Sequence, residues 1–334
     1  MKKFSITILT IILVIFLGCT SSAKPNSKSF CGDARIFSSG TNDELANEVA
    51  KLLGQDLGKV NITKFKDGEI SLSLEESVRG KDCIIIQSIE KPVNDNLVKY
   101  LLLADTMKRN GARTITAVIP YMGYSRQDRM IKYGDPISAK MVAGLISKTG
   151  TDRVITIDLH SMQIEGFFDI PIENVEGQTI FVPYFKEIIK DNIDDFVVVS
   201  PDVGGISRAR KLAKQLGLDL AIVDKHRPQA NVSEVKSIIG NVKGKKVILV
   251  DDMIDTAGSI TNAAKAVKEY GALEVYACAT HAVLSGPAID RITNSPIRQV
   301  ILLDTINISK ELPENFLVLS TSEKIADVLS KLFS

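Results

Sequence analysis

Residues 245–261 read K-K-V-I-L-V-D-D-M-I-D-T-A-G-S-I-T, and this stretch decides the fold. Its apolar run, residues 247–250, predicts a buried strand of the kind found in parallel sheets that are covered on both faces. Two acidic residues follow the strand, and a short loop of small and hydroxyl-bearing residues leads into a predicted helix. A strand that passes through a polar loop into a helix is typical of α/β proteins, which bind ligands beyond the carboxyl ends of their strands.

The same alternation of strand and helix continues on both sides of this stretch. Strands are expected at residues 60–65, 83–87, 114–119, 153–157, 196–199, 220–223, 246–250, 275–280 and 299–303. Helices are expected at residues 43–53, 94–110, 138–149, 179–190, 207–216, 259–270 and 323–332. This order predicts an α/β protein of doubly wound architecture with mainly parallel sheets.

The composition excludes several classes of protein. The 334 residues suggest about two domains. With 41 basic and 40 acidic residues the net charge is only +1, which argues against a protein whose main role is to coat nucleic acid or an anionic membrane. A hydrophobic content of 45% excludes disorder as the main state. The cysteines lack metal-ligand spacing, and Cys83 and Cys278 are expected to be buried thiols in strands.

Residues 1–29 differ from the rest of the chain. Lys2 and Lys3 precede an apolar run, residues 11–17, which is followed by Gly18 and Cys19. This pattern is similar to a bacterial lipoprotein signal, in which Cys19 would be acylated. An uncleaved membrane anchor and an extension upstream of the true start codon are the two other interpretations. In each case these residues are set apart from the fold.

The loop after the strand at 246–250 has the components of a phosphate cradle. Thr256, Ala257, Gly258 and Ser259 offer two hydroxyl groups and backbone N–H groups at the start of a helix. The preceding carboxylates suit the vicinal hydroxyls of a sugar or a hydrated Mg²⁺; they are Asp251, Asp252 and Asp255. The alternative, an ordinary acidic turn that caps a helix, is less favoured because three acids within five residues end one hydrophobic strand.

Other strand ends carry polar residues that are expected at the same edge. Arg126 and Arg129 flank Gln127 on a loop that suits a polyphosphate, with an ordinary surface loop as the alternative. His160 and Asp202 each follow a strand, and a lid containing Lys225 is expected after the strand at 220–223. The chain lacks both the P-loop pattern and G-x-G-x-x-G after a strand, which excludes those two nucleotide-binding folds.

The complete set of motifs resembles one family. The motifs are F-K-D-G-E (65–69), R-Q-D-R (126–129), D-L-H-S-M-Q-I-E-G-F-F-D-I-P (158–171), S-P-D-V-G-G (200–205), K-H-R-P (225–228), D-D-M-I-D-T-A-G-S (251–259) and T-H-A-V-L-S-G-P (280–287). From about residue 34 to residue 332 the chain resembles class I ribose-phosphate pyrophosphokinases, also called phosphoribosyl pyrophosphate synthetases. The element at 251–259 alone also fits a phosphoribosyltransferase, and R-Q-D-R with G-F-F-D-I-P favours the narrower family.

The resemblance implies a fold, an activity and an assembly. The fold is two tandem phosphoribosyltransferase-like domains, at residues 30–171 and 172–321, with the helix at 322–334 packed back on the first. The activity is transfer of the β,γ-pyrophosphoryl group of ATP to the 1-hydroxyl of ribose 5-phosphate, with Mg²⁺ as cofactor. The implied assembly is a homohexamer with no nucleic-acid partner. Because both substrates are cytosolic, the catalytic domain is expected in the cytoplasm, with a membrane tether as one interpretation of residues 1–29.

The resemblance also assigns roles to residues. ATP is expected to contact Phe65, Asp67, Gly68, Glu69, Arg126, Gln127 and Arg129, in part through a neighbouring subunit. Ribose 5-phosphate is expected at Asp251, Asp252, Asp255, Thr256, Ala257, Gly258 and Ser259. His160 and Asp202 are expected to bind the metal, and Lys225 and Arg227 to act as a catalytic lid. A non-catalytic regulatory paralogue and a phosphoribosyltransferase are the alternative functions.

Overall fold

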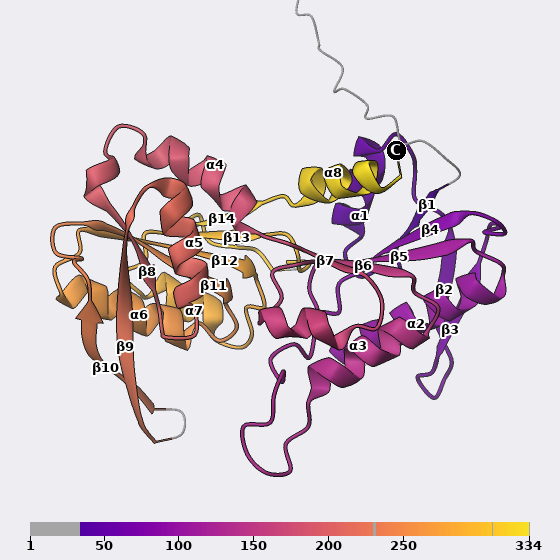
Figure 1. The fold of residues 1–334 in the computed structure, drawn as a ribbon, viewed down its shortest axis with the longest axis horizontal. Coiled ribbons are helices and arrows are strands. Elements are labelled where there is room, and N and C mark those ends of the chain that lie inside the picture. Colours follow the sequence, from indigo (N-terminus) through magenta and orange to yellow (C-terminus); the bar gives the residue numbers. More distant parts are fainter. Residues whose placement is uncertain (1–33, 230–231, 309, 334) are drawn as a thin grey trace, which may run out of the picture.

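The protein consists of two α/β units, each built around its own parallel sheet (Figure 1). The computed structural model describes residues 34–229, 232–308 and 310–333, and within residues 225–236 it describes the backbone alone. Residues 1–29, with their lipoprotein-like pattern, therefore lie outside the described residues. None of the described helices is both long enough and apolar enough to cross a membrane.

The first sheet has five strands in the order β1-β4-β5-β6-β7, and every neighbouring pair is parallel. The strands are β1 (Arg35–Phe37), β4 (Asp82–Ile86), β5 (Thr114–Ile119), β6 (Arg153–Ile157) and β7 (Ile172–Val175). A separate antiparallel hairpin is formed by β2 (Val60–Lys64) and β3 (Ile70–Leu74). The central strands are apolar along their length because helices cover both faces of the sheet.

Each face of the first sheet has its own helices and its own core. One face packs against α2 (Val93–Arg109) and α3 (Ser138–Lys148). The opposite face packs against α1 (Asp43–Leu52) and α8 (Ser322–Leu332). The last helix thus returns from the second unit to the first, where Ile325 and Leu329 are buried in the same core as Leu45 and Val49.

The second sheet has seven strands in the order β10-β9-β8-β11-β12-β13-β14, all parallel except for β10. The strands are β8 (Phe196–Ser200), β9 (Asp219–Gln229), β10 (Val232–Ile239), β11 (Lys246–Met253), β12 (Glu274–His281), β13 (Gln299–Leu303) and β14 (Phe316–Leu319). Helices α4 (Gln178–Ile189) and α5 (Ile206–Leu216) cover one face. Helices α6 (Gly258–Glu269) and α7 (Ala288–Thr293) cover the other.

The strand order of the second sheet reverses between β8 and β11. From β8 the chain passes outward to β9 and β10, and from β11 it proceeds in the opposite direction to β12, β13 and β14. Two loops therefore diverge at the carboxyl ends of β8 and β11, and such a switch point is where doubly wound sheets bind ligands. The short helices η1 (Met162–Phe167) and η2 (Ile193–Asp195) complete the fold.

Two expectations from the sequence differ from the structure. The segment Ile172–Val175 pairs with β6 as the edge of the first sheet, so a domain boundary after residue 171 would divide that sheet. We therefore propose a boundary after β7. The expected lid is not a loop, because β9 continues to Gln229 and forms an antiparallel ladder with β10. Cys83 and Cys278 are buried and unpaired, as predicted.

Candidate active site

Most of the predicted site residues line one cavity of about 1150 Å³ at the switch point of the second sheet. They come from both units and are Arg126, Arg129, His160, Asp202, Asp251, Asp252, Asp255, Thr256, Ala257, Gly258 and Ser259. Parallel strands present their carboxyl ends at one edge of a sheet, which explains why residues so far apart in sequence meet here. The sequence therefore predicted the composition of this cavity well.

The loop between β11 and α6 forms one wall. Ala257 has φ +61°, in the left-handed region, and directly precedes the first residue of α6. The first N–H groups of a helix have no partner within it, and in the described structure no side chain caps this end. Arg291 donates to the Thr256 carbonyl at 3.0 Å and holds the loop in place. Backbone N–H groups at the N-terminus of a helix suit a phosphate group.

Four side chains form an ionic cluster at the end of β11. The Asp252 carboxylate is 2.6 Å from Nδ1 of His160, which comes from the first unit. Arg208, in the first turn of α5, lies 3.7 Å from Asp251 and 3.6 Å from Asp252. His160 of the first unit and Arg208 of the second unit therefore both interact with Asp252, and Arg208 also interacts with Asp251.

The two adjacent carboxyl groups have opposite pKa shifts. Burial, together with the neighbouring charge of Asp252, raises the pKa of Asp251 well above its ordinary value. Burial also disfavours ionisation of Asp252, but the His160 hydrogen bond and the Arg208 charge outweigh it and lower the pKa of that carboxyl. The same hydrogen bond raises the pKa of His160. The cluster therefore holds its negative charge on Asp252.

Arg126 and Asp255 connect the two units across the cavity. The guanidinium Nη1 of Arg126 lies 2.6 Å from Oδ2 of Asp255. The other oxygen, Oδ1, is buried and accepts no hydrogen bond from the described residues. Burial opposes ionisation of Asp255, but hydrogen bonds from Ser285 and Arg126 hold its pKa below the ordinary value. An ionised carboxylate with an unpaired oxygen faces the basic loop of the first unit.

The loop after β8 supplies the third wall. Asp202 accepts a hydrogen bond from the Gly205 N–H at 3.1 Å, and its own carbonyl accepts one from the Ser200 hydroxyl at 2.6 Å. The loop is thus folded on itself just before α5 begins, and the Asp202 carboxylate borders the cavity.

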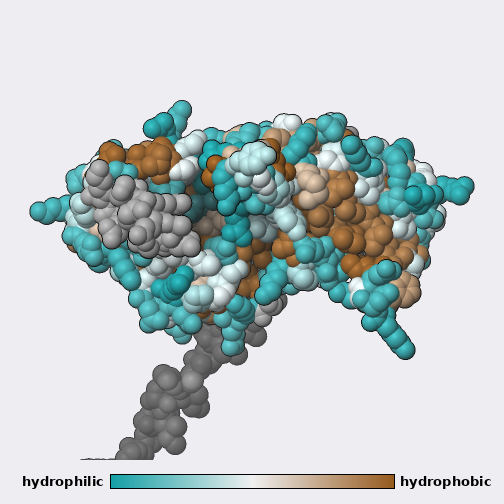
Figure 2. Space-filling model, turned by 90° about the horizontal axis from the view of Figure 1, so that it is seen from below, coloured by the Kyte–Doolittle hydropathy of each residue, from teal (hydrophilic) through white to brown (hydrophobic). Residues whose placement is uncertain are grey.

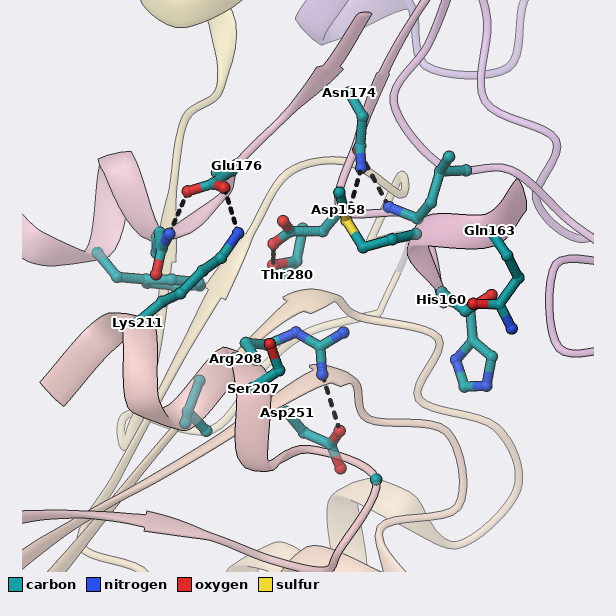
Figure 3. Close-up of a pocket in the computed structure, with 17 residues that line it drawn as sticks. Asp158, His160, Gln163, Asn174, Glu176, Ser207, Arg208, Lys211, Asp251 and Thr280 are labelled. Carbon is teal, nitrogen blue, oxygen red and sulfur yellow. Dashed lines mark hydrogen bonds and ion pairs between the residues drawn. The ribbon is translucent and has the colours of Figure 1, made fainter. Parts of the chain in front are cut away.

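A second pocket of about 320 Å³ adjoins the main cavity and shares His160, Arg208 and Asp251 with it (Figure 3). Glu176 and Lys211 line this second pocket and form an ion pair with a distance of 2.5 Å. The Thr280 hydroxyl donates to Oδ2 of Asp158 at 2.5 Å, which ties the second unit to the loop that carries His160.

Several predicted residues are placed elsewhere. Phe65, Asp67, Gly68 and Glu69 form the turn of the β2–β3 hairpin and are not among the described residues that line the cavity. Phe65 is 59% exposed on this hairpin and does not line the cavity of its own chain.

Gln127 differs from its neighbours on the basic loop. Its side-chain oxygen accepts a hydrogen bond from Ser138 at 2.6 Å and so fixes the loop to the start of α3. Lys225 and Arg227 lie in β9, and their side chains are outside the described part of the chain.

Three contributors were missed by the sequence reasoning. Asp128 accepts hydrogen bonds from Ser161 and Gln163 and thereby joins the basic loop to the loop after β6. Arg208 and Arg291 fix the carboxylates and the phosphate-binding loop. The signal for Arg208 was a basic residue three positions after the last glycine of S-P-D-V-G-G, whereas nothing in the sequence distinguished Arg291.

The donor atoms of the cavity are compatible with Mg²⁺. Among the described residues no group of three or more His, Cys, Asp or Glu side chains is placed to hold a metal ion. Mg²⁺ usually binds one or two carboxylates together with substrate phosphates, so a closed protein cage is not required. The unpaired Oδ1 of Asp255 is an oxygen atom that a nearby cation would satisfy.

Comparison with known proteins places this site in a family. Ribose-phosphate pyrophosphokinase of Clostridium tetani is 51% identical over 300 residues, which cover 90% of this chain and 94% of the relative. That of Bacillus subtilis is 50% identical over 296 residues, 88% of this chain and 92% of the relative. The chain belongs to the ribose-phosphate pyrophosphokinase family. The resemblance, the fold class and the assignment as an enzyme are thereby confirmed.

The domain matches agree with the two units. Residues 34–150 match the N-terminal domain of ribose phosphate pyrophosphokinase, and residues 179–314 match the phosphoribosyl transferase domain. The crystal structure of phosphoribosylpyrophosphate synthetase from Mycobacterium smegmatis is 38% identical and superposes with a TM-score of 0.85. The match covers 90% of this chain and 99% of that one, so the pyrophosphokinase fold extends over both units.

Proposed function

We propose that this pyrophosphokinase transfers the β,γ-pyrophosphoryl group of ATP to the 1-hydroxyl of ribose 5-phosphate, giving phosphoribosyl pyrophosphate and AMP. One observation carries the proposal. The helix N-terminus after β11, which suits a sugar phosphate, and the basic loop of the first unit face one another across one cavity and are joined by the Arg126–Asp255 pair. Two phosphorylated substrates bound on these two walls would meet between them.

Ribose 5-phosphate binds on the wall of the second unit. Residues 256–259 hold the 5-phosphate with backbone N–H groups and hydroxyls at the start of α6. Asp251, Asp252 and Asp255 lie next to this loop, where carboxylates can accept hydrogen bonds from the ribose hydroxyls. This arrangement would place the 1-hydroxyl toward the first unit.

ATP binds on the wall of the first unit. Arg126 and Arg129 contact its phosphates, and the five donors of a guanidinium allow Arg126 to keep its bond to Asp255 while it binds phosphate. Gln127 shapes this loop through Ser138. Phe65, Asp67, Gly68 and Glu69 contact ATP bound to a neighbouring copy, because their hairpin lies away from this chain's own cavity.

Charge neutralisation and alignment do most of the chemical work. Phosphoryl-type transfer depends on positioning and on stabilisation of charge more than on covalent catalysis. His160 and Asp202 are the proposed residues for Mg²⁺, which when bound neutralises charge on the phosphate oxygens. Arg208 holds the Asp251 and Asp252 carboxyl groups, and Lys225 and Arg227 are the proposed catalytic residues.

Assembly would complete the site with a second copy. An apolar surface extends over α2 and α3 of the first unit (Figure 2). Val98 and Leu102 are 44% and 36% exposed on α2, and Met141 and Leu145 are 51% and 40% exposed on α3. Contiguous apolar residues on a soluble domain mark an interaction surface. We propose that this surface joins copies of the chain into a homohexamer.

The test of the function is a product assay on the purified full chain with ATP, ribose 5-phosphate and Mg²⁺. Formation of AMP and phosphoribosyl pyrophosphate is expected, and Lys225→Ala should abolish it. A folded, oligomeric protein that binds ATP without forming product would instead support a regulatory paralogue. Activity only with phosphoribosyl pyrophosphate and a nucleobase would support a phosphoribosyltransferase. We also propose that the catalytic part faces the cytoplasm, which cell fractionation would check.

A further inference from the structure

The loop that carries His160 begins with a residue in an uncommon backbone conformation. Asp158 directly follows β6 and has φ +42°, in the left-handed region that side-chain-bearing residues seldom adopt. Such a conformation persists only where the surroundings impose it, and it is found where a loop serves a function. His160 lies two residues further on, so the backbone at Asp158 sets the direction in which the loop approaches Asp252.

Two consecutive residues of the other unit hold Asp158 in this conformation. At the end of β12, Nε2 of His281 lies 3.0 Å from the carbonyl oxygen of Asp158. The neighbouring Thr280 hydroxyl donates to Oδ2 of the same residue at 2.5 Å. Both the main chain and the side chain of Asp158 are therefore bound from across the domain junction.

The surroundings of His281 fix the orientation of its ring. The side chain is buried, with 2% exposure, and burial lowers the pKa of the imidazole. The neutral ring must carry its proton on Nε2, because a carbonyl oxygen only accepts hydrogen bonds. Nδ1 lies 2.9 Å from the Thr305 hydroxyl oxygen, and that hydroxyl also lies 2.9 Å from the Thr280 carbonyl, so its single proton is shared between these two acceptors. Tyr121, which belongs to the first unit, packs against the imidazole, and the centroids of the two rings are 4.9 Å apart.

The strand register relates this contact to the ionic cluster. Met253 of β11 is paired with His281 of β12, so Asp252 and His281 lie on adjacent strands near the same sheet edge. The loop after β6 is thus attached to the second unit at two points, Asp158 to His281 and His160 to Asp252.

We propose that His281 is a positioning residue, which donates a hydrogen bond to the Asp158 carbonyl and thereby orients the loop that places His160 at the metal-binding wall of the site. The inference rests on the proposed role of His160. Outer residues that orient metal ligands commonly change metal affinity by about tenfold or more when they are substituted.

The test uses variants of the full chain that separate the donor from the bulk of the ring. His281→Leu removes the donor, whereas His281→Gln retains an amide N–H that imitates Nε2. Thr280→Val removes only the hydrogen bond to the Asp158 side chain, and it replaces His281→Leu in the test if that variant does not fold. Tyr100→Phe is the matched control, because it removes an equally buried hydrogen bond, to Thr151, far from the site.

Two readouts are measured. Hydrogen exchange of the amides at residues 158–160, without metal or substrate, reports the order of the loop. The Mg²⁺ concentration for half-maximal activity reports how the order of this loop affects metal binding. We expect His281→Leu to accelerate exchange and to raise the half-maximal Mg²⁺ concentration by about tenfold, with a smaller effect of Thr280→Val. His281→Gln should remain within about twofold of wild type, and Tyr100→Phe should lower only the melting temperature.

The proposal is overturned if His281→Leu matches Tyr100→Phe in both readouts, or if His281→Gln is as impaired as His281→Leu. Failure of the proposed function gives a different result. A wild-type chain that is inactive at every Mg²⁺ concentration would leave the hydrogen-exchange comparison to decide the positioning role by itself.

Discussion

At the residue scale, Arg208 interacts with both carboxyl groups at the end of β11. It lies 3.7 Å from Asp251 and 3.6 Å from Asp252, and its side chain is only 22% exposed. Loss of one partner from a partly buried ionic cluster leaves an uncompensated charge. The arrangement of the two carboxylates beneath the proposed ribose therefore depends on this arginine.

We predict that Arg208→Gln lowers kcat/KM by about a hundredfold, comparable with the loss of one stabilising group from a preorganised site. Arg208→Lys should recover part of the activity, since it restores the charge without the planar fork. Arg210, exposed on the same helix, supplies the control, and Arg210→Gln should leave kcat/KM unchanged. Steady-state kinetics with both substrates measure the effect. Equal activity of the Arg208→Gln and Arg210→Gln variants would contradict it.

Sequence reasoning at this scale succeeded where topology alone determines position. His160 follows β6 and Asp251 lies near the end of β11, yet both line one cavity because parallel strands end at a common edge. It could not assign Gln127, since only the structure shows that the side chain bonds to Ser138. Arg291 lies on a short helix with no motif around it, and its contact with a loop carbonyl depends on tertiary packing.

At the scale of elements, the helix α8 stabilises a unit to which it is not adjacent in sequence. Leu329 is fully buried against the core that contains Leu45 and Val49 of α1. We predict that Leu329→Ala lowers the free energy of unfolding by about 2–5 kcal/mol, the usual effect of truncating a buried leucine. Lys324→Ala on the same helix should change it by less than about 0.5 kcal/mol. Urea denaturation gives both values, and equal values would exclude a stabilising role for this packing.

β7 and the extension of β9 were not predicted, because polar residues interrupt their apolar pattern. β7 reads I-E-N-V, and an edge strand needs few apolar residues because one side lacks a neighbouring strand. The extension of β9 beyond Val223 is rich in charged residues and is held by its ladder with β10. The central strands β5, β6 and β13 began and ended where the sequence indicated, since both of their faces are buried.

At the scale of the whole molecule, the apolar surface over α2 and α3 predicts self-association. Leu145→Glu introduces a charge in this surface and should reduce the assembly to smaller species, because an unpaired carboxylate is costly to bury. Lys265→Ala, exposed on α6, changes the net charge equally and is the control. Analytical ultracentrifugation distinguishes the two. If the Leu145→Glu variant has the same assembly mass as wild type, the interface between copies does not include this surface.

The junction between the two units also makes stability depend on pH. Glu90 is 5% exposed, and its carboxylate oxygen accepts the Asn307 N–H of the other unit at 2.7 Å. Burial raises the pKa of this carboxyl from 4.5 to about 8, so at neutral pH it is mostly protonated. Between these two values the folded chain binds a proton that the unfolded chain has released. The contribution of Glu90 to stability should therefore be complete below pH 4.5 and should be lost as the pH rises to about 8.

Replacement of Glu90 by glutamine tests this expectation, because the amide oxygen can still accept the Asn307 N–H and cannot ionise. Each pH unit of the interval contributes about 1.4 kcal/mol, so the variant should gain on the order of 4 kcal/mol relative to wild type between pH 5 and pH 9. Glu75→Gln, at an exposed position, should leave the pH profile unchanged. Urea denaturation at a series of pH values gives the three profiles. If the Glu90→Gln profile runs parallel to that of wild type, Glu90 is ionised in the folded protein and the junction contains a buried charge.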